Sequence, residues 1–158
     1  MARDAIQTWF IVLVVVRLGR RFLLVHERKH GQGFYLPAGR VEPGETLIEA
    51  AKRETMEEAG IPIELEHIIR VEHSPQPGGW ARVRVIFAAR PLDDRPPKSI
   101  PDEESLGAGW FTLEELDRLP LRGSEVKEIF SHVANGGALY PLDLLTHEGD
   151  SYRLGSRT

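Results

Sequence analysis

A short stretch, RETMEEAG, crowds three glutamates beside one arginine between residues 53 and 60. Residues of an α-helix are separated by about 100° around its axis, so Glu54, Glu57 and Glu58 fall within one arc of roughly 100°. Like charges at this spacing repel each other. Leu47 and two alanines lie on or beside the same arc. The acids therefore extend the stripe that should face the protein interior, and not a solvated face.

Half-buried carboxylates need a compensating positive charge, because an unpaired buried charge is very costly. Arg53 can balance only one of the three glutamates. A hard divalent cation with oxygen ligands, Mg²⁺ or Mn²⁺, would neutralise the others. Magnesium commonly keeps several waters and binds substrate phosphates, so the cluster points to phosphate chemistry. A calcium EF-hand is excluded, because its ligands follow a different spacing within a loop.

The helix that would carry these acids has clear boundaries, from about residue 46 to 59. Thr46 and Glu49 have the spacing of a capping box at its start. Gly60 stands where a left-handed C-terminal cap is expected. The residues between are mostly good helix formers.

The surrounding pattern predicts strands on both sides of this helix and further helices near the end. Strands are expected over residues 9–17, 21–28, 34–40, 61–74 and 81–91, and helical segments within 109–119 and 124–137. The first two strands form a hairpin, PQPGG forms a turn, and the proline-rich stretch at 93–105 forms a loop. This is a mixed α/β layered domain. We expect one domain over residues 1–147 and a loose tail over 148–158.

Composition fits one ordinary globular domain. The chain has 158 residues, 41% hydrophobic and 28% charged, with a formal net charge of −4. The charge gives no basic footprint for nucleic acid. The absence of cysteine excludes disulfides and thiolate chemistry. The apolar run WFIVLVVV is far shorter than the roughly 20 residues of a membrane span and lacks a following cleavage site. We therefore expect a cytoplasmic protein.

The segment from Gly39 to Ile61, GRVEPGETLIEAAKRETMEEAGI, resembles the Nudix box, GX5EX7REUXEEXGU, in which U is a bulky aliphatic residue. The matching positions are Gly39, Glu45, Arg53, Glu54, Glu57, Glu58, Gly60 and Ile61. Thr55 departs from the pattern, at a packing position away from the acidic arc. The resemblance covers roughly residues 8 to 135 and implies an α/β/α sandwich around a mixed β-sheet.

The resemblance also implies an activity and site roles. Nudix hydrolases cleave a nucleoside diphosphate linked to another moiety by attack of water at phosphorus. Glu54, Glu57 and Glu58 would coordinate Mg²⁺, often with the backbone carbonyl of Gly39. Arg53, paired with Glu45, would hold Glu54 in orientation. These box residues are the expected catalytic and metal-binding set.

A carboxylate must take the proton of the attacking water. Glu54 is one candidate for this general base. Many family members use a glutamate on a later loop, ahead of a W-F strand, and Glu104 stands in that position here. Glu103 and Asp102 are its rivals in the same stretch.

Several short stretches, such as YLPAGRVEPGE and ESLGAGWF, resemble the branch that dephosphorylates oxidised guanine nucleotides such as 8-oxo-dGDP. Substrate contacts are expected from Arg28, Tyr35 and Trp80, whereas Trp9 and Phe34 are expected in the core. ADP-ribose and nucleotide-sugar pyrophosphatases share the same box. Many ADP-ribose members carry a marker proline about 15 residues beyond the box. Pro75 and Pro77 lie near there, but within a turn, so this marker is ambiguous.

Two other functional classes compete with this interpretation. An RNA 5′-end pyrophosphohydrolase would prefer a basic groove. A nucleotide-sensing module without catalysis typically loses acids from the box, and this chain keeps all three. Family members often form homodimers, although no patch in the sequence indicates one.

Overall fold

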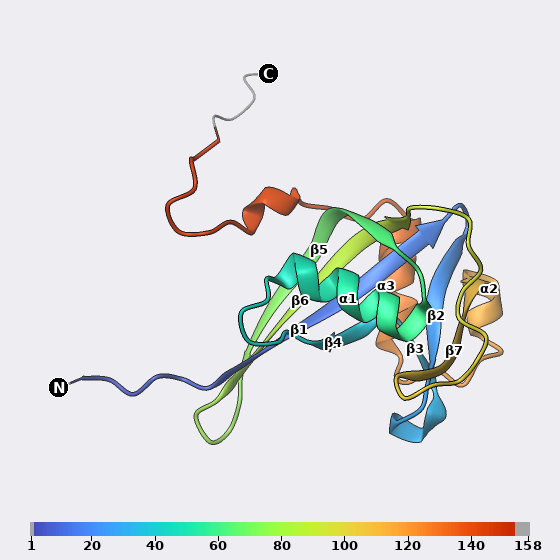
Figure 1. Cartoon of the computed structure of the whole chain (residues 1–158), viewed down its shortest axis with the longest axis horizontal. Helices are drawn as coiled ribbons and strands as arrows, with labels where there is room; N and C mark the ends of the chain where they lie inside the picture. The colour runs from blue at the N-terminus through green and yellow to red at the C-terminus, as the bar shows by residue number, and fades with distance from the viewer. Residues whose placement is uncertain (1, 154–158) are drawn as a thin grey trace.

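A mixed sheet of seven strands forms the centre of the structure, a computed structural model that describes residues 2–153 (Figure 1). The strands are β1 (Thr8–Leu18), β2 (Arg21–Glu27), β3 (Phe34–Tyr35), β4 (Ala38–Arg40), β5 (Ile63–Pro75), β6 (Ala81–Pro91) and β7 (Ser105–Thr112). The main path runs β3-β2-β1-β6-β5, with β4 beside β1 and β7 beside β2. β1 is parallel to β6, and the other strand pairs are antiparallel.

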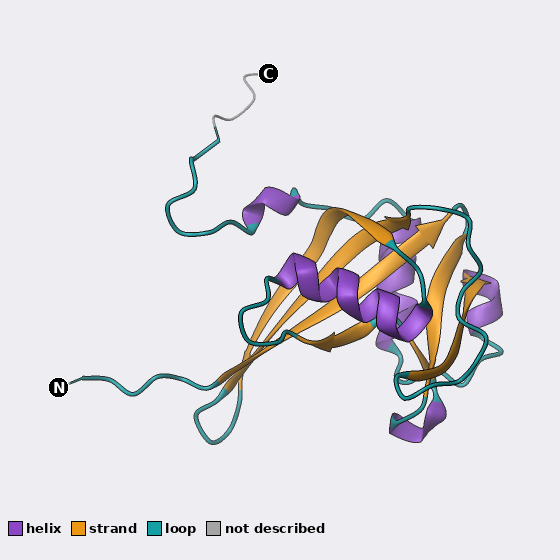
Figure 2. Ribbon diagram, viewed as in Figure 1, coloured by secondary structure: helices purple, strands orange, loops and turns teal. Residues whose placement is uncertain are grey.

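Helices cover both faces of this sheet (Figure 2). They are α1 (Leu47–Ala59), α2 (Leu113–Leu116) and α3 (Glu125–Ala134), with 3₁₀ turns at His30–Gln32 and Leu142–Leu144. Alternate residues of β1 serve the two layers: Val12 and Val14 pack with the alanines of α1, whereas Leu13 and Val15 pack with Phe130 of α3. A strand buried on both faces needs a continuous apolar run, which explains the VLVVV sequence. The predicted α/β/α sandwich is confirmed.

The ends of α1 are fixed as the sequence predicts. The Thr46 hydroxyl accepts the Glu49 N–H at 3.1 Å, which satisfies one orphan donor of the first turn. Gly60 has a φ of 69°, and its N–H donates to the Met56 carbonyl at 2.9 Å. Thr55 is fully buried, and its hydroxyl donates to the Ala51 carbonyl at 2.8 Å, so its polar group is satisfied within the helix.

Two expectations about the flanking segments need correction. Trp9 is not in the core: it is 37% exposed near the start of β1, and the Arg40 guanidinium lies 4.0 Å from its ring centroid. Phe34 is partly buried against the α3 side of the core. The expected single strand over 34–40 is two strands, because β3 pairs with β2 while β4 crosses to pair with β1.

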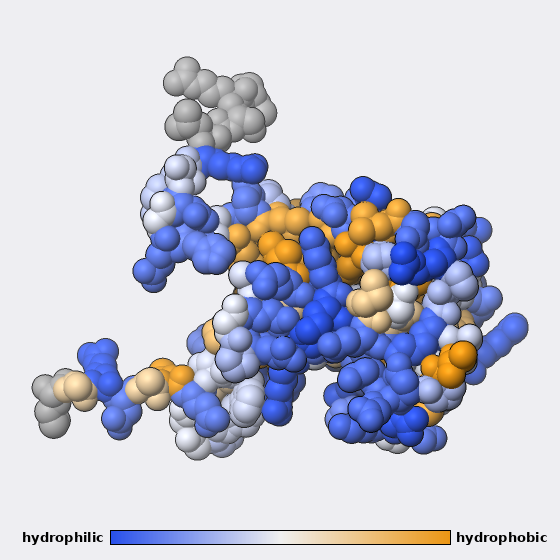
Figure 3. All heavy atoms as spheres, in the orientation of Figure 1, coloured by the Kyte–Doolittle hydropathy of each residue, from blue (hydrophilic) through white to orange (hydrophobic). Residues whose placement is uncertain are grey.

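The segment that follows α3 returns along β5. Tyr140 and Ile68 form an antiparallel bridge, and Leu142 and Leu145 pack against the α1 side of the core. Figure 3 shows mostly hydrophilic surface over α1 and hydrophobic surface on the side of β5. The expected loose tail falls partly on residues 154–158, which lie outside the described residues. Within residues 2–153, no helix has the length and apolar character needed to cross a membrane.

Candidate active site

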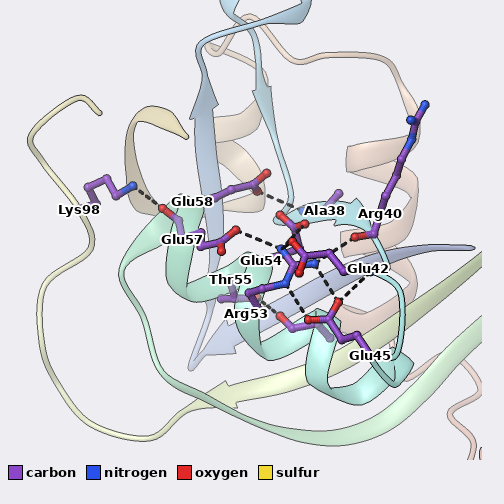
Figure 4. A network of polar contacts seen from close by, with 11 residues as sticks. Ala38, Arg40, Glu42, Glu45, Arg53, Glu54, Thr55, Glu57, Glu58 and Lys98 are labelled. Carbon is purple, nitrogen blue, oxygen red and sulfur yellow. Dashed lines mark hydrogen bonds and ion pairs between the residues drawn. The ribbon is translucent and has the colours of Figure 1, made fainter. Parts of the chain in front are cut away.

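Two of the box glutamates on α1 press against the short strand β4 (Figure 4). Glu54 is only 9% exposed. A Cβ atom added at Gly39 would lie 2.1 Å from the Glu54 Cδ atom, so only glycine allows this close approach. Glu58 accepts the backbone N–H of Ala38 at 3.2 Å. The carboxylates of an otherwise amphipathic helix are thereby placed at the edge of the sheet.

Arg53 forms hydrogen bonds with three glutamates of the segment 39–61. Its Nε and Nη2 atoms donate to the two carboxylate oxygens of Glu45 at 2.7 and 2.9 Å. Its Nη1 atom donates to Glu54 at 2.8 Å and to Glu57 at 3.1 Å. A further bond from Nη2 reaches the Arg40 carbonyl at 3.0 Å. The hydrogen bond from the planar guanidinium therefore holds the Glu54 carboxylate in position. Gly39 packs closely against the same carboxylate.

The electrostatics of the site show an excess of negative charge. Burial raises the pKa of Glu58 to about 9, opposed by the Ala38 N–H and reinforced by the charges of Glu54, Glu27 and Glu104. Burial also raises the pKa of Glu54, although Arg53 opposes the shift. In contrast, the hydrogen bond from Arg53 lowers the pKa of Glu45. The two carboxylates nearest β4 therefore lack sufficient positive charge from the protein.

The chemistry of this donor set fits a hard divalent cation. The available donors are carboxylate oxygens and backbone carbonyls, as Mg²⁺ and Mn²⁺ prefer, and a bound cation would offset the burial that raises the pKa of Glu54 and Glu58. In residues 2–153, no three acidic or histidine side chains already converge as a metal cage. Arg53 instead engages Glu54 and Glu57.

The loop before β7 is fastened to the C-terminal end of α1. The Lys98 ammonium donates to the Glu57 carbonyl and pairs with Asp102 at 2.6 Å. The buried Ser105 hydroxyl donates to the Glu58 carbonyl at 2.6 Å. These bonds satisfy carbonyls that have no partner within the last turn of a helix. They also bring the candidate general base Glu104 to the same site.

The three loop acids have different surroundings. One oxygen of Asp102 accepts the N–H groups of Glu104 and Ser105 at 2.9 and 3.1 Å. The Lys98 ammonium holds the pKa of Asp102 down to about 2. Asp102 therefore shapes the loop, while Glu103 and Glu104 line the adjoining cavity.

This cavity has a volume of about 360 Å³ and joins the acidic cluster to a basic rim. Glu58 and Glu104 lie in its wall with the predicted substrate-binding residues Arg28 and Tyr35. The structure does not bring Trp80 to this cavity: it follows the turn between β5 and β6. Lining residues that sequence reasoning missed are Glu27, Lys29, Arg40, Arg82, Arg84 and Arg122.

Tyr35 lies in the cavity wall but is largely buried, at 5% exposure. Its hydroxyl donates to Glu125 of α3. Burial, reinforced by that carboxylate, raises the pKa of Tyr35. Glu125 also accepts from Arg84 at 2.9 Å. The hydroxyl of Tyr35 is therefore committed to the protein, and the Arg122 guanidinium lies over its ring.

Signals for some of the missed residues exist in the sequence. The alternation ARVRV places Arg82 and Arg84 on one side of their strand. Arg122, by comparison, reaches the cavity through a contact with Glu27, 95 residues away in the chain, and no local pattern predicts it.

Comparisons with known proteins agree with the geometry. A family model described as "NUDIX domain" matches residues 8–132. Human "8-oxo-dGDP phosphatase NUDT18" is 42% identical over 108 residues, which are 66% of this chain and 32% of that protein. The chain thus spans about a third of that relative. "Phosphatase NudJ" of Escherichia coli K12 is 34% identical over 136 residues, 85% of this chain and 88% of its own.

A solved structure gives the same result for the fold. A NUDIX hydrolase from Nitrosomonas europaea aligns with a TM-score of 0.75 and 27% identity, covering 92% of this chain and 100% of that chain. The family match spans most of the sequence, and the structure places Glu54 against Gly39 and Glu58 in the wall of a charged cavity. The chain belongs to the Nudix hydrolase family.

Proposed function

We propose that the chain is a pyrophosphohydrolase that depends on Mg²⁺, or on Mn²⁺ in its place, and cleaves a nucleoside diphosphate linked to another group. The proposed substrate is an oxidised guanine nucleoside di- or triphosphate, such as 8-oxo-dGDP. The main support is the acidic cluster of α1, held against Gly39 at one end of a cavity with a basic rim. The printed activity of the NUDT18 relative supports the choice of nucleotide.

Each group of residues has a separate task in this proposal. Glu54, Glu57, Glu58 and the Gly39 carbonyl would hold the cation, which when bound supplies charge neutralisation of the diphosphate and activation of water. Arg53 keeps Glu54 in place. Glu104 accepts the proton of the attacking water. Arg28 and Lys29 of the rim bind phosphate oxygens, for which cationic side chains are well suited.

The test is hydrolysis of a nucleotide panel with and without Mg²⁺ or Mn²⁺. The panel holds 8-oxo-dGDP, 8-oxo-dGTP, dGDP, ADP-ribose and UDP- and GDP-sugars. We expect turnover only with the metal, strongest on the oxidised guanine nucleotides, and a loss of at least 100-fold in kcat for Glu57→Gln. Glu49→Gln, an exposed change on the same helix, is the matched control and should keep full activity.

Different outcomes would redirect the proposal. A preference for ADP-ribose or a sugar nucleotide would name another branch of the family. An undiminished rate in Glu104→Gln would move the general base to Glu54. Nucleotide binding without hydrolysis of any panel member would overturn the enzymatic proposal in favour of a nucleotide-sensing module.

A further inference from the structure

An ion pair between the partly buried Glu27 and the exposed Arg122 lies in the wall of the cavity. The Nη1 atom of Arg122 donates to the two oxygens of Glu27 at 3.0 and 3.3 Å. Its guanidinium also stacks over the ring of Tyr35, 4.7 Å from the centroid. The Arg122 N–H donates to the Phe34 carbonyl at 2.9 Å, which ties its backbone to β3. The pair is therefore a positioned feature of the cavity and not a loose surface contact.

This pair keeps unused hydrogen-bonding capacity, unlike the guanidinium groups of Arg53 and Arg84. Arg53 has every terminal nitrogen engaged, and Arg84 is engaged by Glu72 and Glu125. Within residues 2–153, Arg122 uses only Nη1, so Nε and Nη2 remain available as donors. A carboxylate has about four lone-pair sites, and Glu27 uses two of them. The cavity wall thus offers acceptors and donors side by side.

The presence of Glu27 decides what kind of ligand group suits this pair. A phosphate approaching Arg122 would meet the negative charge of Glu27 at close range. A neutral group that presents donors next to an acceptor meets no such repulsion. The Watson–Crick edge of guanine has this pattern: the N1–H and N2–H groups donate, and O6 accepts. The same edge is present in 8-oxoguanine.

We propose that Glu27 and Arg122 read the guanine edge of the substrate, with the Glu27 carboxylate accepting from N1–H and N2–H and Arg122 donating to O6. This deepens the proposed function and rests on it. Adenine presents only one donor group on that edge, so it would leave part of the carboxylate unpaired. Hypoxanthine, which lacks the N2 amine, would lose one bond in the same way. Glu27 and Glu58 line the same cavity, so this base subsite adjoins the acidic cluster.

The experiment compares kcat/KM for dGDP, dIDP and dADP, and for 8-oxo-dGDP with 8-oxo-dADP. One hydrogen bond to a charged group is worth about 10- to 100-fold, so the parent should prefer guanine over hypoxanthine and adenine by such a factor. In Glu27→Gln one acceptor oxygen is replaced by a donor amide, which suits adenine. The guanine-to-adenine ratio should fall by at least 10-fold, with adenine turnover retained or raised.

Glu114→Gln is the matched control. It breaks a Glu–Arg pair, to Arg20, that also joins distant parts of the chain but lies outside the cavity. Its base preference should equal that of the parent. An equal loss for guanine and adenine in Glu27→Gln would overturn the inference, because that result describes a structural role or a phosphate contact.

A failure of the proposed enzymatic function can be distinguished experimentally from a failure of the base-reading inference. If the parent hydrolyses no nucleotide, calorimetric dissociation constants for dGDP and dADP replace the rates in the same comparison. A dGDP preference that disappears in Glu27→Gln would support the base-reading role without catalysis. Equal binding of the two nucleotides by the parent would overturn it.

Discussion

Gly39 leaves room for the Glu54 carboxylate, and this is a requirement of space and not of backbone torsion. Gly39→Ala would place a methyl group 2.1 Å from the carboxylate carbon of Glu54, so that side chain must move. We expect activity to fall at least 100-fold, because a carboxylate displaced by about 1 Å loses its productive geometry. Turnover measured against metal concentration checks this.

The control for this change is Gly109→Ala on β7. There the nearest atoms to the added Cβ belong to the ring of Phe111, at 3.0 Å, and this ring can move more easily than the Glu54 carboxylate that Arg53 holds. Gly109→Ala should keep most of the activity. Full activity in Gly39→Ala would show that Glu54 does not need its present position.

The raised pKa of Glu58 predicts that the stability of the protein decreases as the pH rises. Its pKa is raised to about 9 in the folded protein from 4.5 in the reference state, mainly by burial. Between these values the folded state holds a proton that the unfolded state has released. Stability of the metal-free protein should therefore fall as pH rises through this window. Because Glu58 keeps contact with the cavity, we expect a change of about 1–3 kcal/mol.

Urea unfolding of the metal-free protein at pH 5.5 and pH 8.5 measures this effect. In Glu58→Gln the dependence should become much flatter, whereas the exposed Glu49→Gln should retain it. If parent and Glu58→Gln respond identically to pH, another group controls the stability in this range.

At the residue scale, the spacing of the three box glutamates predicts that they lie on one side of α1, because that spacing repeats with the helix turn. It also predicts Arg53, which lies on the same helix. It fails for Trp9, because an apolar run does not reveal where a strand extends beyond the layer that covers it. The position of Arg122 in the cavity cannot be predicted from the sequence for a related reason: it depends on a contact with Glu27, which is distant in the chain.

At the element scale, Lys98 and Ser105 fasten the loop that carries Glu104 to the end of α1. Lys98→Met would remove the bond to the Glu57 carbonyl and the pair with Asp102, while keeping much of the buried length of the side chain. We expect kcat to fall about 10-fold with little change in KM, because the loop loses its fixed position. Steady-state kinetics with and without this substitution test the expectation.

Lys127→Met provides the comparison, since it breaks an exposed pair with Asp117 far from the loop. Its kinetics should match the parent. An unchanged kcat in Lys98→Met would mean that Ser105 and the backbone hold the loop without help from the ammonium group.

At this scale, the bounds of helices and strands are easier to predict from the sequence than the pairing between strands. Capping residues and a terminal glycine define α1 within one residue, because these signals act locally. The division of residues 34–40 between β3 and β4 depends on which strands lie beside them. Local sequence does not indicate which strands will be neighbours. The parallel pairing of β1 with β6 is unpredictable for the same reason, because the two strands lie far apart in the chain.

At the scale of the whole molecule, the helical layers of α1 and α3 contribute different residues to the site. The α1 layer carries the acids and receives the loop of Glu104. The α3 layer supplies Glu125, which holds Tyr35 and Arg84 in the wall of the same cavity. Because β1 is buried between both layers, its alternating side chains pack against each of them.

The segment after α3 packs against this sandwich without lining the cavity. Leu142 and Leu145 cover the core beside β5, and the Tyr140–Ile68 bridge aligns them. Ending the chain after Gly137 would expose that apolar surface, so we expect a loss of about 2–4 kcal/mol in the free energy of unfolding. Ending it after His147 should leave stability unchanged, which tests the predicted domain limit. Urea unfolding and turnover of both truncated chains separate the effects: lower stability with near-normal kcat for the shorter chain is expected, whereas loss of stability in the longer one would move the domain boundary into the tail.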